Sequence, residues 1–432
     1  MVTAIIFIII LGVLIFVHEL GHFLTARRNG IKAYEFGFGF PPRIIGFQRL
    51  TGKKMEKVAE EKETQVQISE SAATKNIEVV KEVVTEKIRE IDEITPVKKW
   101  RFIFGRRDGD DEWEEKDLDE AHKNKYAGGT IYSLNLIPIG GFVKIKGENG
   151  DQKNDTDSFA GRNAWVRIKV LAAGVIMNFA LAWILISLVM MIGAPELTER
   201  GADNQNKKIQ IIAVASQSPA EKMGLNVGDE ILKVQGIKAD SIETIQKYIA
   251  DHKGQEVALE VKRGNKILEL KGTPRLEAPQ GEGALGIQFG ETVIVVYPWY
   301  EAIWRGFTTV LDLIWLMLTT LFGIITSFLF GQKVAVEVAG PVGIAVLTKQ
   351  VTTLGLVYVL QFAALLSINL GIINALPIPA LDGGRILFII IEKLKGKPVA
   401  QQTEHLFHTV GFILLLGLMI FITFRDVLKF IK

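Results

Sequence analysis

Long apolar segments alternate along the chain with stretches of mixed polar and apolar character. Four of these segments have the roughly 20 apolar residues that a helix needs to cross a bilayer. They lie at residues 1–26, 170–194, 351–376 and 406–424. A fifth apolar stretch, Leu313–Phe330, is of borderline length. The pattern predicts a polytopic α-helical membrane protein with four transmembrane helices.

The region between the second and third spans has a different pattern. Residues 205–275 alternate apolar and polar positions, then turn, then become helical, and Glu256–Leu270 adds a strand pair. Within this region, SPAEKMGLNVGDEILKVQG at Ser218–Gly236 resembles a PDZ domain of the bacterial protease type. Such domains bind extended peptides by adding a strand to a sheet edge. We therefore expect a PDZ-like α+β domain here, followed by a linker at 276–346.

A charged segment at 48–126 interrupts the region between the first two spans. Within it, NIEVVKEVVTEKIREIDEI at Asn76–Ile94 places valines and isoleucines on one helical face. This helix either packs on its own domain or binds a cytoplasmic partner, and the pattern leaves both open. On either side, residues 27–47 are predicted to be a cytoplasmic loop and residues 149–169 a cytoplasmic linker.

Composition narrows the classes of function. With 48% hydrophobic residues, the chain is too apolar for an ordinary soluble enzyme. Its net charge of +2 does not indicate a nucleic-acid partner. Because there is no cysteine, disulfides, thiolate catalysis and cysteine-type zinc sites are excluded. The apolar amino terminus lacks the basic segment of a cleavable signal peptide, so we expect it to be retained.

Basic residues indicate the orientation of the spans. They gather between the first and second spans, at Arg27, Arg28, Lys32, Arg162, Arg167 and Lys169. By the positive-inside rule, the amino terminus and the PDZ-like domain lie outside, and residues 27–169 lie in the cytoplasm. The loop at 377–404 is then cytoplasmic as well.

The first span carries an unusual polar cluster, FVHELGHFLTA at Phe16–Ala26. Ionisable groups at membrane depth are costly and indicate a functional site. His18 and His22 lie one helical turn apart on one face, so both can bind the same zinc ion. Glu19, beside the first of them, can act as general base on a water molecule.

A catalytic zinc site usually has a third protein ligand. His405 and His408 open the fourth span and could contribute one. The better candidate is Asp382, within NALPIPALDGGRI at Asn374–Ile386, just beyond the third span. Proline and glycine interrupt an apolar helix there, and irregular backbone at membrane depth is tolerated only where it is buried in protein or lines a wet cavity.

With HELGH in the first span and LDG after the third, the sequence resembles the site-2 protease family of intramembrane zinc metalloproteases, in particular its RseP-like bacterial branch with periplasmic PDZ domains. Further motifs carry the resemblance in the same order: EFGFGFPPRI at Glu35–Ile44, YSLNLIPIGGFVKIKGE at Tyr132–Glu148, AAGVIMNFALA at Ala172–Ala182 and AGPVGIA at Ala339–Ala345. Only the charged insertion falls outside it. The chain departs from the family in having one PDZ-like domain where well-known relatives have two, and Gly174-Val175 where Gly-Pro is usual.

The resemblance implies roles for particular residues. Zinc would be held by His18, His22 and Asp382, with Glu19 as the catalytic acid and base. Asn374 and Pro377 would help to hold the substrate. A β-hairpin at 127–148 would dip into the membrane and clamp the substrate through a segment comprising Gly140, Gly141, Phe142 and Val143. Phe142 stands where the family usually has tyrosine.

The resemblance also implies a function. It is regulated intramembrane proteolysis in the bacterial cytoplasmic (inner) membrane, in contact with lipid. Expected substrates are single-span membrane proteins, such as anti-sigma factors or signal-peptide remnants, after a first extracytoplasmic cut. The alternative is a non-catalytic membrane scaffold that binds partners through its PDZ-like domain.

The stretch Leu313–Phe330 affects whether Asp382 can lie on the same side of the membrane as His18. Another crossing there would place Asp382 on the opposite side of the membrane from His18. We therefore expect this stretch to be an interfacial or docked helix.

Overall fold

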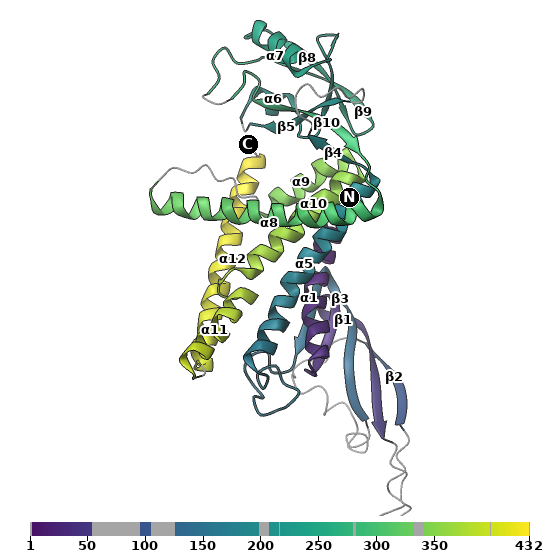
Figure 1. Cartoon of the computed structure of the whole chain (residues 1–432), viewed down its shortest axis with the longest axis vertical. Helices are drawn as coiled ribbons and strands as arrows, with labels where there is room; N and C mark the ends of the chain where they lie inside the picture. Colours follow the sequence, from purple (N-terminus) through teal and green to yellow (C-terminus); the bar gives the residue numbers. More distant parts are fainter. Residues whose placement is uncertain are drawn as a thin grey trace, which may run out of the picture. The chain divides into compact units, whose positions relative to one another are not determined.

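The structure is a computed structural model that describes residues 2–53, 96–104, 126–197, 207–215, 217–279, 282–331, 340–397 and 399–431. It divides into two compact units, Ala26–Arg162 and the combination of Met1–Thr25 with Asn163–Lys432 (Figure 1). The predicted helix at Asn76–Ile94 lies outside the described residues.

The larger unit contains the apolar helices. Among the described residues, five helices are long and apolar enough to cross a membrane. They are α1 (Val2–Arg28), α5 (Ala164–Ile192), α8 (Trp299–Leu329), α10 (Leu356–Ala375) and α12 (Gln401–Ile431). The prediction of a polytopic α-helical membrane protein is thereby confirmed.

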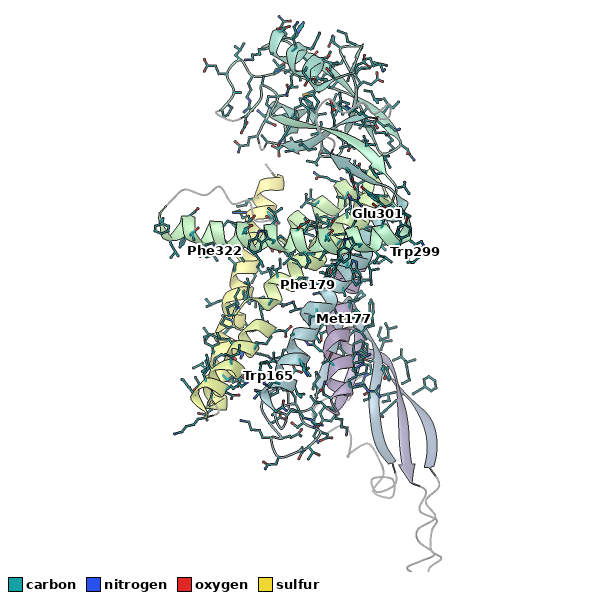
Figure 2. All side chains as sticks on the ribbon, viewed as in Figure 1. Trp165, Met177, Phe179, Trp299, Glu301 and Phe322 are labelled. Carbon is teal, nitrogen blue, oxygen red and sulfur yellow. The ribbon has the colours of Figure 1, made fainter. Side chains whose placement is uncertain are left out.

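Helix α8 contains the borderline stretch except its last residue, Phe330, and runs across α5 rather than along it (Figure 1). The indole Nε1 of Trp183 on α5 donates a hydrogen bond of 2.8 Å to the carbonyl of Ile303. At Gly306 the two helices are so close that a Cβ atom would lie 2.3 Å from Ser187 Oγ. Figure 2 shows Trp299 and Phe322 on this crossing helix.

The predicted third span at 351–376 consists of parts of two helices. α9 (Pro341–Leu354) ends where Gly355 has a φ of 121°, a conformation that glycine adopts without steric cost. α10 then begins at Leu356. A short irregular stretch joins α10 to α11 (Asp382–Lys395).

Helix α5 is the centre of the helical packing, with contacts to α8, α10 and α11. Ala182 on α5 and Ala364 on α10 are fully buried where these helices meet. Small side chains favour such close helix approach in membranes. The Ser367 hydroxyl on α10 also donates a hydrogen bond of 2.8 Å to the Asn178 carbonyl. These contacts fix α5 and α10 relative to each other.

The α+β domain predicted at 205–275 is larger than expected. Its sheet has the order β4-β10-β5-β6-β8-β9, with β7 beside β6. The strands are β4 (Ala194–Leu197), β5 (Lys208–Val214), β6 (Glu230–Val234), β7 (Ile237–Lys238), β8 (Val257–Arg263), β9 (Lys266–Gly272) and β10 (Ile287–Val295), and the helices are α6 (Pro219–Met223) and α7 (Ile242–Asp251). The domain extends into the predicted linker because β10 pairs with both β4 and β5.

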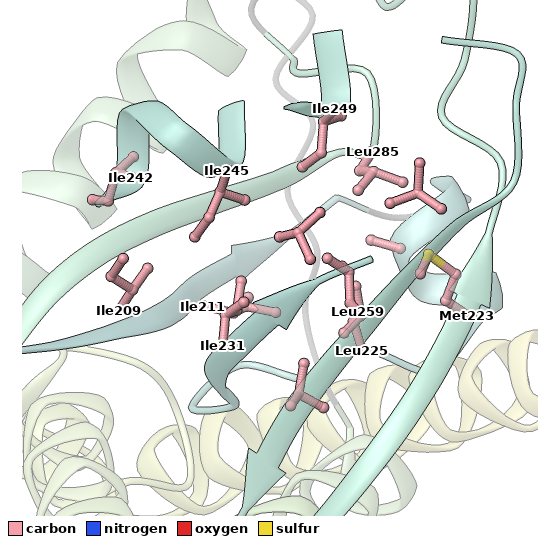
Figure 3. Packing of buried hydrophobic residues seen from close by; sticks show 14 residues of the cluster. Ile209, Ile211, Met223, Leu225, Ile231, Ile242, Ile245, Ile249, Leu259 and Leu285 are labelled. Atoms are coloured by element: carbon pink, nitrogen blue, oxygen red, sulfur yellow. The ribbon is translucent and has the colours of Figure 1, made fainter. Parts of the chain in front are cut away.

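The core of this domain explains its stability. Alternate residues of β5 and β8 are buried, so one face of the sheet packs against α7. Figure 3 shows Ile211, Ile245 and Leu259 in this core, each at most 1% exposed. Burying side chains of this size contributes about 1.5–3 kcal/mol each.

The smaller unit is built around a sheet with the order β2-β1-β3. Its strands are β1 (Ala33–Lys53), β2 (Pro96–Phe104) and β3 (Tyr126–Ile145). The predicted loop at 27–47 is therefore wrong in part, because most of it is strand. The insertion at 48–126 contributes the end of β1 and all of β2 to the sheet.

The arms of the predicted hairpin at 127–148 are not direct neighbours. Glu35–Phe38 of β1 pairs with Gly141–Lys144 on one side and with Ile131–Leu134 on the other. The first part of β1 is therefore inserted between the two arms. Sequence reasoning missed this strand because its glycines and its Pro-Pro pair are typical of loops.

A buried ion pair stabilises the PDZ-like domain. The fully buried Asp229 accepts hydrogen bonds of 2.7 and 2.6 Å from Arg263 and one of 2.9 Å from the Asn226 backbone. The bond from Arg263 to Asp229 raises the pKa of the guanidinium. Asp229→Ala should lower the free energy of unfolding of this domain by about 3–5 kcal/mol, because it leaves a charge without its partner. Hydrogen exchange on the full-length protein measures this loss.

Asp240→Ala is the matched control for this prediction. Its partner Lys238 is 80% exposed, so we expect a change below about 0.5 kcal/mol. Equal protection from exchange in both variants would contradict the assignment of a stabilising role to Asp229.

Candidate metal centre

Three predicted ligand side chains converge in the larger unit. His18 Nε2 lies 3.0 Å and His22 Nε2 lies 3.3 Å from Asp382 Oδ2. The two Nε2 atoms are 3.1 Å apart. Among the described residues, these three side chains form the one cluster of histidine and carboxylate groups that could hold a metal ion.

The size of this triangle fits zinc. Bonds of 2.0–2.1 Å in tetrahedral geometry place ligand atoms about 3.3–3.4 Å apart. The three observed separations lie within a few tenths of an ångström of that value. Both histidines are buried, at 7% exposure, so the cluster lies in a largely dry environment. The donor set and its spacing therefore fit the cofactor that the sequence predicts.

Helix α5 supports both imidazole rings through residues on successive turns. The carbonyl of Val170 accepts a hydrogen bond of 2.8 Å from His22 Nδ1. Gly174 lies directly against the rings, where a Cβ atom would be 2.4 Å from His22 Nε2. One turn further, the fully buried Asn178 amide lies 3.1 Å from His18 Nδ1. Any residue larger than glycine at the middle position would displace the ligands.

The contact with Val170 determines which ring nitrogen of His22 faces the cluster. Because a carbonyl can only accept, His22 carries its proton on Nδ1, and its Nε2 lone pair is directed at the cluster. A cation on His18 Nε2 would require the same tautomer, with Nδ1–H donating to Asn178. In the structure the Nδ2 atom of Asn178 faces His18 Nδ1, and its Oδ1 atom is buried without a hydrogen-bond partner among the described residues. Rotation of the amide by half a turn would present Oδ1 to His18 Nδ1 as an acceptor.

The third side chain comes from the start of α11. Its first turn packs tightly on the preceding irregular segment, because a Cβ on Gly383 would lie 2.2 Å from the Leu376 carbonyl oxygen. A Cβ on Gly384 would be equally close to the Ile378 carbonyl oxygen. The two glycines after Asp382 therefore allow the helix to begin at the depth where its carboxylate reaches the histidines.

The other predicted residues lie in several places. Glu19 is half-buried on α1 and interacts electrostatically with His22. Asn374 is half-buried in the last turn of α10, and Pro377 is exposed in the turn that follows. Residues 140–143 lie on β3 of the smaller unit. His408, the alternative ligand, instead accepts a hydrogen bond from the Ala380 backbone N–H.

Sequence reasoning did not assign roles to Val170, Gly174 and Asn178. A signal for Asn178 exists, since it is a lone amide in a span without charges and an uncompensated amide at that depth is costly. The carbonyl of Val170 leaves no trace in the sequence, because every residue type has one.

The sequence model of one known protein family matches most of this chain. The family model described as "Peptidase family M50" matches residues 6–55 and 121–418. The chain belongs to peptidase family M50. The identification as an RseP-like site-2 zinc metallopeptidase is thereby confirmed.

Full-length relatives agree with membership in this family. The "Regulator of sigma-W protease RasP" of Bacillus subtilis is 32% identical, with 98% of each chain covered. The "Zinc metalloprotease RasP" of Geobacillus kaustophilus is 30% identical, over 98% of this chain and 97% of the relative. Among solved structures, the PDZ domain of an SdrC-like protein from Listeria monocytogenes is 23% identical, covering 22% of this chain and 92% of that one, with a TM-score of 0.18.

The support from α5 to this M50 site can be tested by Asn178→Ala. Loss of the amide that lies against His18 Nδ1 should weaken zinc binding by about 10–100-fold, because outer contacts orient the ring. Competition with a chromophoric chelator measures the affinity in detergent. Ile184→Ala, at a 60% exposed position of the same helix, should bind zinc as the wild type does. Equal affinity in all three proteins would exclude a role for the amide in metal binding.

Proposed function

We propose that this chain is a zinc endopeptidase that cuts single-span membrane proteins within or near the bilayer. The convergence of His18, His22 and Asp382 at zinc-ligand spacing is the observation that supports this most strongly. Its peptidase family and the names of its relatives agree with it. A non-catalytic PDZ scaffold would not require a buried cluster of this geometry.

The protein residues have separate tasks in this proposal. His18, His22 and Asp382 hold zinc, which when bound acts as a Lewis acid that polarises a peptide carbonyl and lowers the pKa of water. Glu19 accepts the proton of the attacking water and passes it to the leaving amine. Its half-buried position next to His18 on α1 supports this role. Asn374, in the last turn of α10, helps to hold the substrate backbone.

Substrate binding by strand addition gives residues 140–143 their role. A transmembrane helix hides its peptide bonds, so it must be extended before it can be cut. Gly141–Lys144 pairs with β1 on one side, and no described strand pairs with its other side. Such an edge can hold an extended peptide through backbone hydrogen bonds. Pro377, exposed in the turn after α10, adds to the substrate contacts.

An apolar surface on the smaller unit supports its contact with lipid. Large apolar side chains are exposed around the turn between the arms of β3, at Phe38, Phe40, Leu134, Leu136 and Ile137. Beneath them, Asn135 Nδ2 donates a hydrogen bond of 2.8 Å to the Gly39 carbonyl, and Arg43 pairs with Glu35. With these polar groups paired and its apolar side chains outward, this part of the sheet can dip into the membrane.

We place the protein in the bacterial cytoplasmic membrane, with the PDZ-like domain outside and residues 27–169 inside. In this arrangement α1, α5, α10 and α12 cross the bilayer and α8 lies at its outer interface. The contact of Asp382 with His18 supports an even number of crossings between these two residues, which α5 and α10 supply. The crosswise course of α8 agrees with its not being a further crossing (Figure 1).

The relatives' names indicate the class of substrate. One relative is named a regulator of sigma-W protease. By analogy, substrates of this chain are single-span proteins such as anti-sigma factors or signal-peptide remnants, already shortened on the outside. The PDZ-like domain then docks or filters these shortened substrates. The insertion at 48–126 binds a cytoplasmic partner or packs on its own domain.

Glu19→Gln tests the proposed chemistry. The amide cannot accept a proton, so cleavage of a single-span test substrate should fall by at least about 100-fold. Zinc content, measured on the same preparation, should remain near one ion per chain. The matched variant His22→Ala should lose both zinc and activity. Full cleavage by Glu19→Gln would exclude this residue as the base.

A topology map tests the proposed orientation. Reporter fusions within the PDZ-like domain and just before α8 and α9 should all report the extracytoplasmic side. A fusion in the turn after α11 should report the cytoplasm. Opposite locations for the fusions before α8 and before α9 would make α8 a transmembrane helix and would exclude the interfacial placement.

A further inference from the structure

The last helix of the chain contacts the segment that carries the Asp382 ligand. α11 and α12 lie side by side (Figure 1), with the Phe388 and Phe407 rings 5.0 Å apart. The first turns of α12 therefore pack against α11 beyond the turn that carries Asp382. This contact was not predicted by the motifs, and it is independent of the supports that α5 gives to the histidines.

The segment between α10 and α11 contains a strained turn. The Leu381 N–H donates a hydrogen bond of 3.3 Å to the Ile378 carbonyl, and Ala380 has a φ of 69°. With proline second and a positive φ third, this is the pattern of a type II turn. Glycine is the usual residue at the third position, because alanine there costs roughly 1–2 kcal/mol. Some other contact must hold the turn in this shape.

His408 on α12 supplies that contact. Its Nδ1 atom accepts a hydrogen bond of 2.9 Å from the Ala380 N–H, across 28 residues of chain. The imidazole is fixed by the Phe388 ring, 5.6 Å away between centroids. One turn further along α12, a Cβ on Gly411 would lie 2.0 Å from Pro379 Cβ. The helix thus contacts both central residues of the turn.

The position of α12 is also fixed at its opposite end. The buried Asp426 carboxylate accepts hydrogen bonds of 2.8 and 2.9 Å from the Gly340 and Gly343 N–H groups at the start of α9. Backbone groups at a helix start favour a negative charge. With both ends attached, α12 can hold the His408 ring in a defined place.

We propose that His408 is a positioning residue that holds the Pro379–Ala380 turn and thereby sets the place of the Asp382 carboxylate in the metal site. Asp382 follows Ala380 by two residues, so rotation of this turn displaces the carboxylate from the histidines. Outer contacts of this kind tune metal affinity without touching the metal. The inference rests on the proposed zinc site.

Zinc affinity and cleavage in four variants of the full-length protein test this inference. His408→Ala should weaken zinc binding by about 10–100-fold and lower kcat more than it changes KM. His408→Asn should restore most of the affinity, because its Oδ1 atom can accept the same hydrogen bond. The controls are His405→Ala, whose ring lies against Thr409, and Gly417→Ala, which has no atoms within 4 Å of the added Cβ. Both controls should behave as the wild type.

Two further variants keep the test decisive if His408→Ala does not fold. Gly411→Ala should push α12 away from Pro379 and weaken zinc binding in the same direction. Ala380→Gly removes the strain of the turn, so it should recover part of the affinity when combined with His408→Ala. Wild-type affinity in both His408→Ala and Gly411→Ala would overturn the inference. A wild-type protein that binds no zinc would instead reject the proposed function.

Discussion

A cluster of charged and polar side chains buried among apolar helices depends on protein groups for the hydrogen bonds that water would otherwise make. Here His18, His22 and Asp382 leave two ring nitrogens that need partners, and α5 provides both through Val170 and Asn178. A buried polar group without a partner costs several kcal/mol in hydrocarbon. The need to satisfy these nitrogens therefore fixes α5 against α1, and α8, α10 and α11 pack on α5.

Glycine makes this arrangement sterically possible at three helix contacts. Gly174 leaves room for both imidazoles, Gly21 allows α1 to approach the Ala173 carbonyl, and Gly306 allows α8 to cross α5. A methyl group would overlap ring atoms at Gly174, backbone atoms at Gly21 and the Ser187 hydroxyl at Gly306. Helices in lipid gain little from hydrophobic association, so close packing between small residues contributes much of their attraction. The same residues that stabilise the bundle thus shape the site.

The carboxylate side of the site depends on a longer chain of contacts. Asp382 is placed by the glycines of α11, by the turn at Pro379–Ala380 and, through His408, by α12. The two histidines lie on one continuous helix and need less support. This asymmetry makes the segment between α10 and α11 the part of the site that is most sensitive to movements of the surrounding helices.

The sequence alone was sufficient to predict the family and the cluster of His18, His22 and Asp382, because one-turn spacing on a helix is a local property and HELGH and LDG are compact motifs. It also predicted the apolar helices, since about 20 apolar residues suffice to identify a span. Tertiary structure was needed for the inserted part of β1, for β10 as part of the PDZ-like domain and for the break at Gly355. It also placed Asn178 beside His18 and the His408 ring within hydrogen-bond distance of the Ala380 N–H. These features depend on pairing between residues far apart in the chain, and a local pattern carries no information about which distant backbone or ring will be its partner.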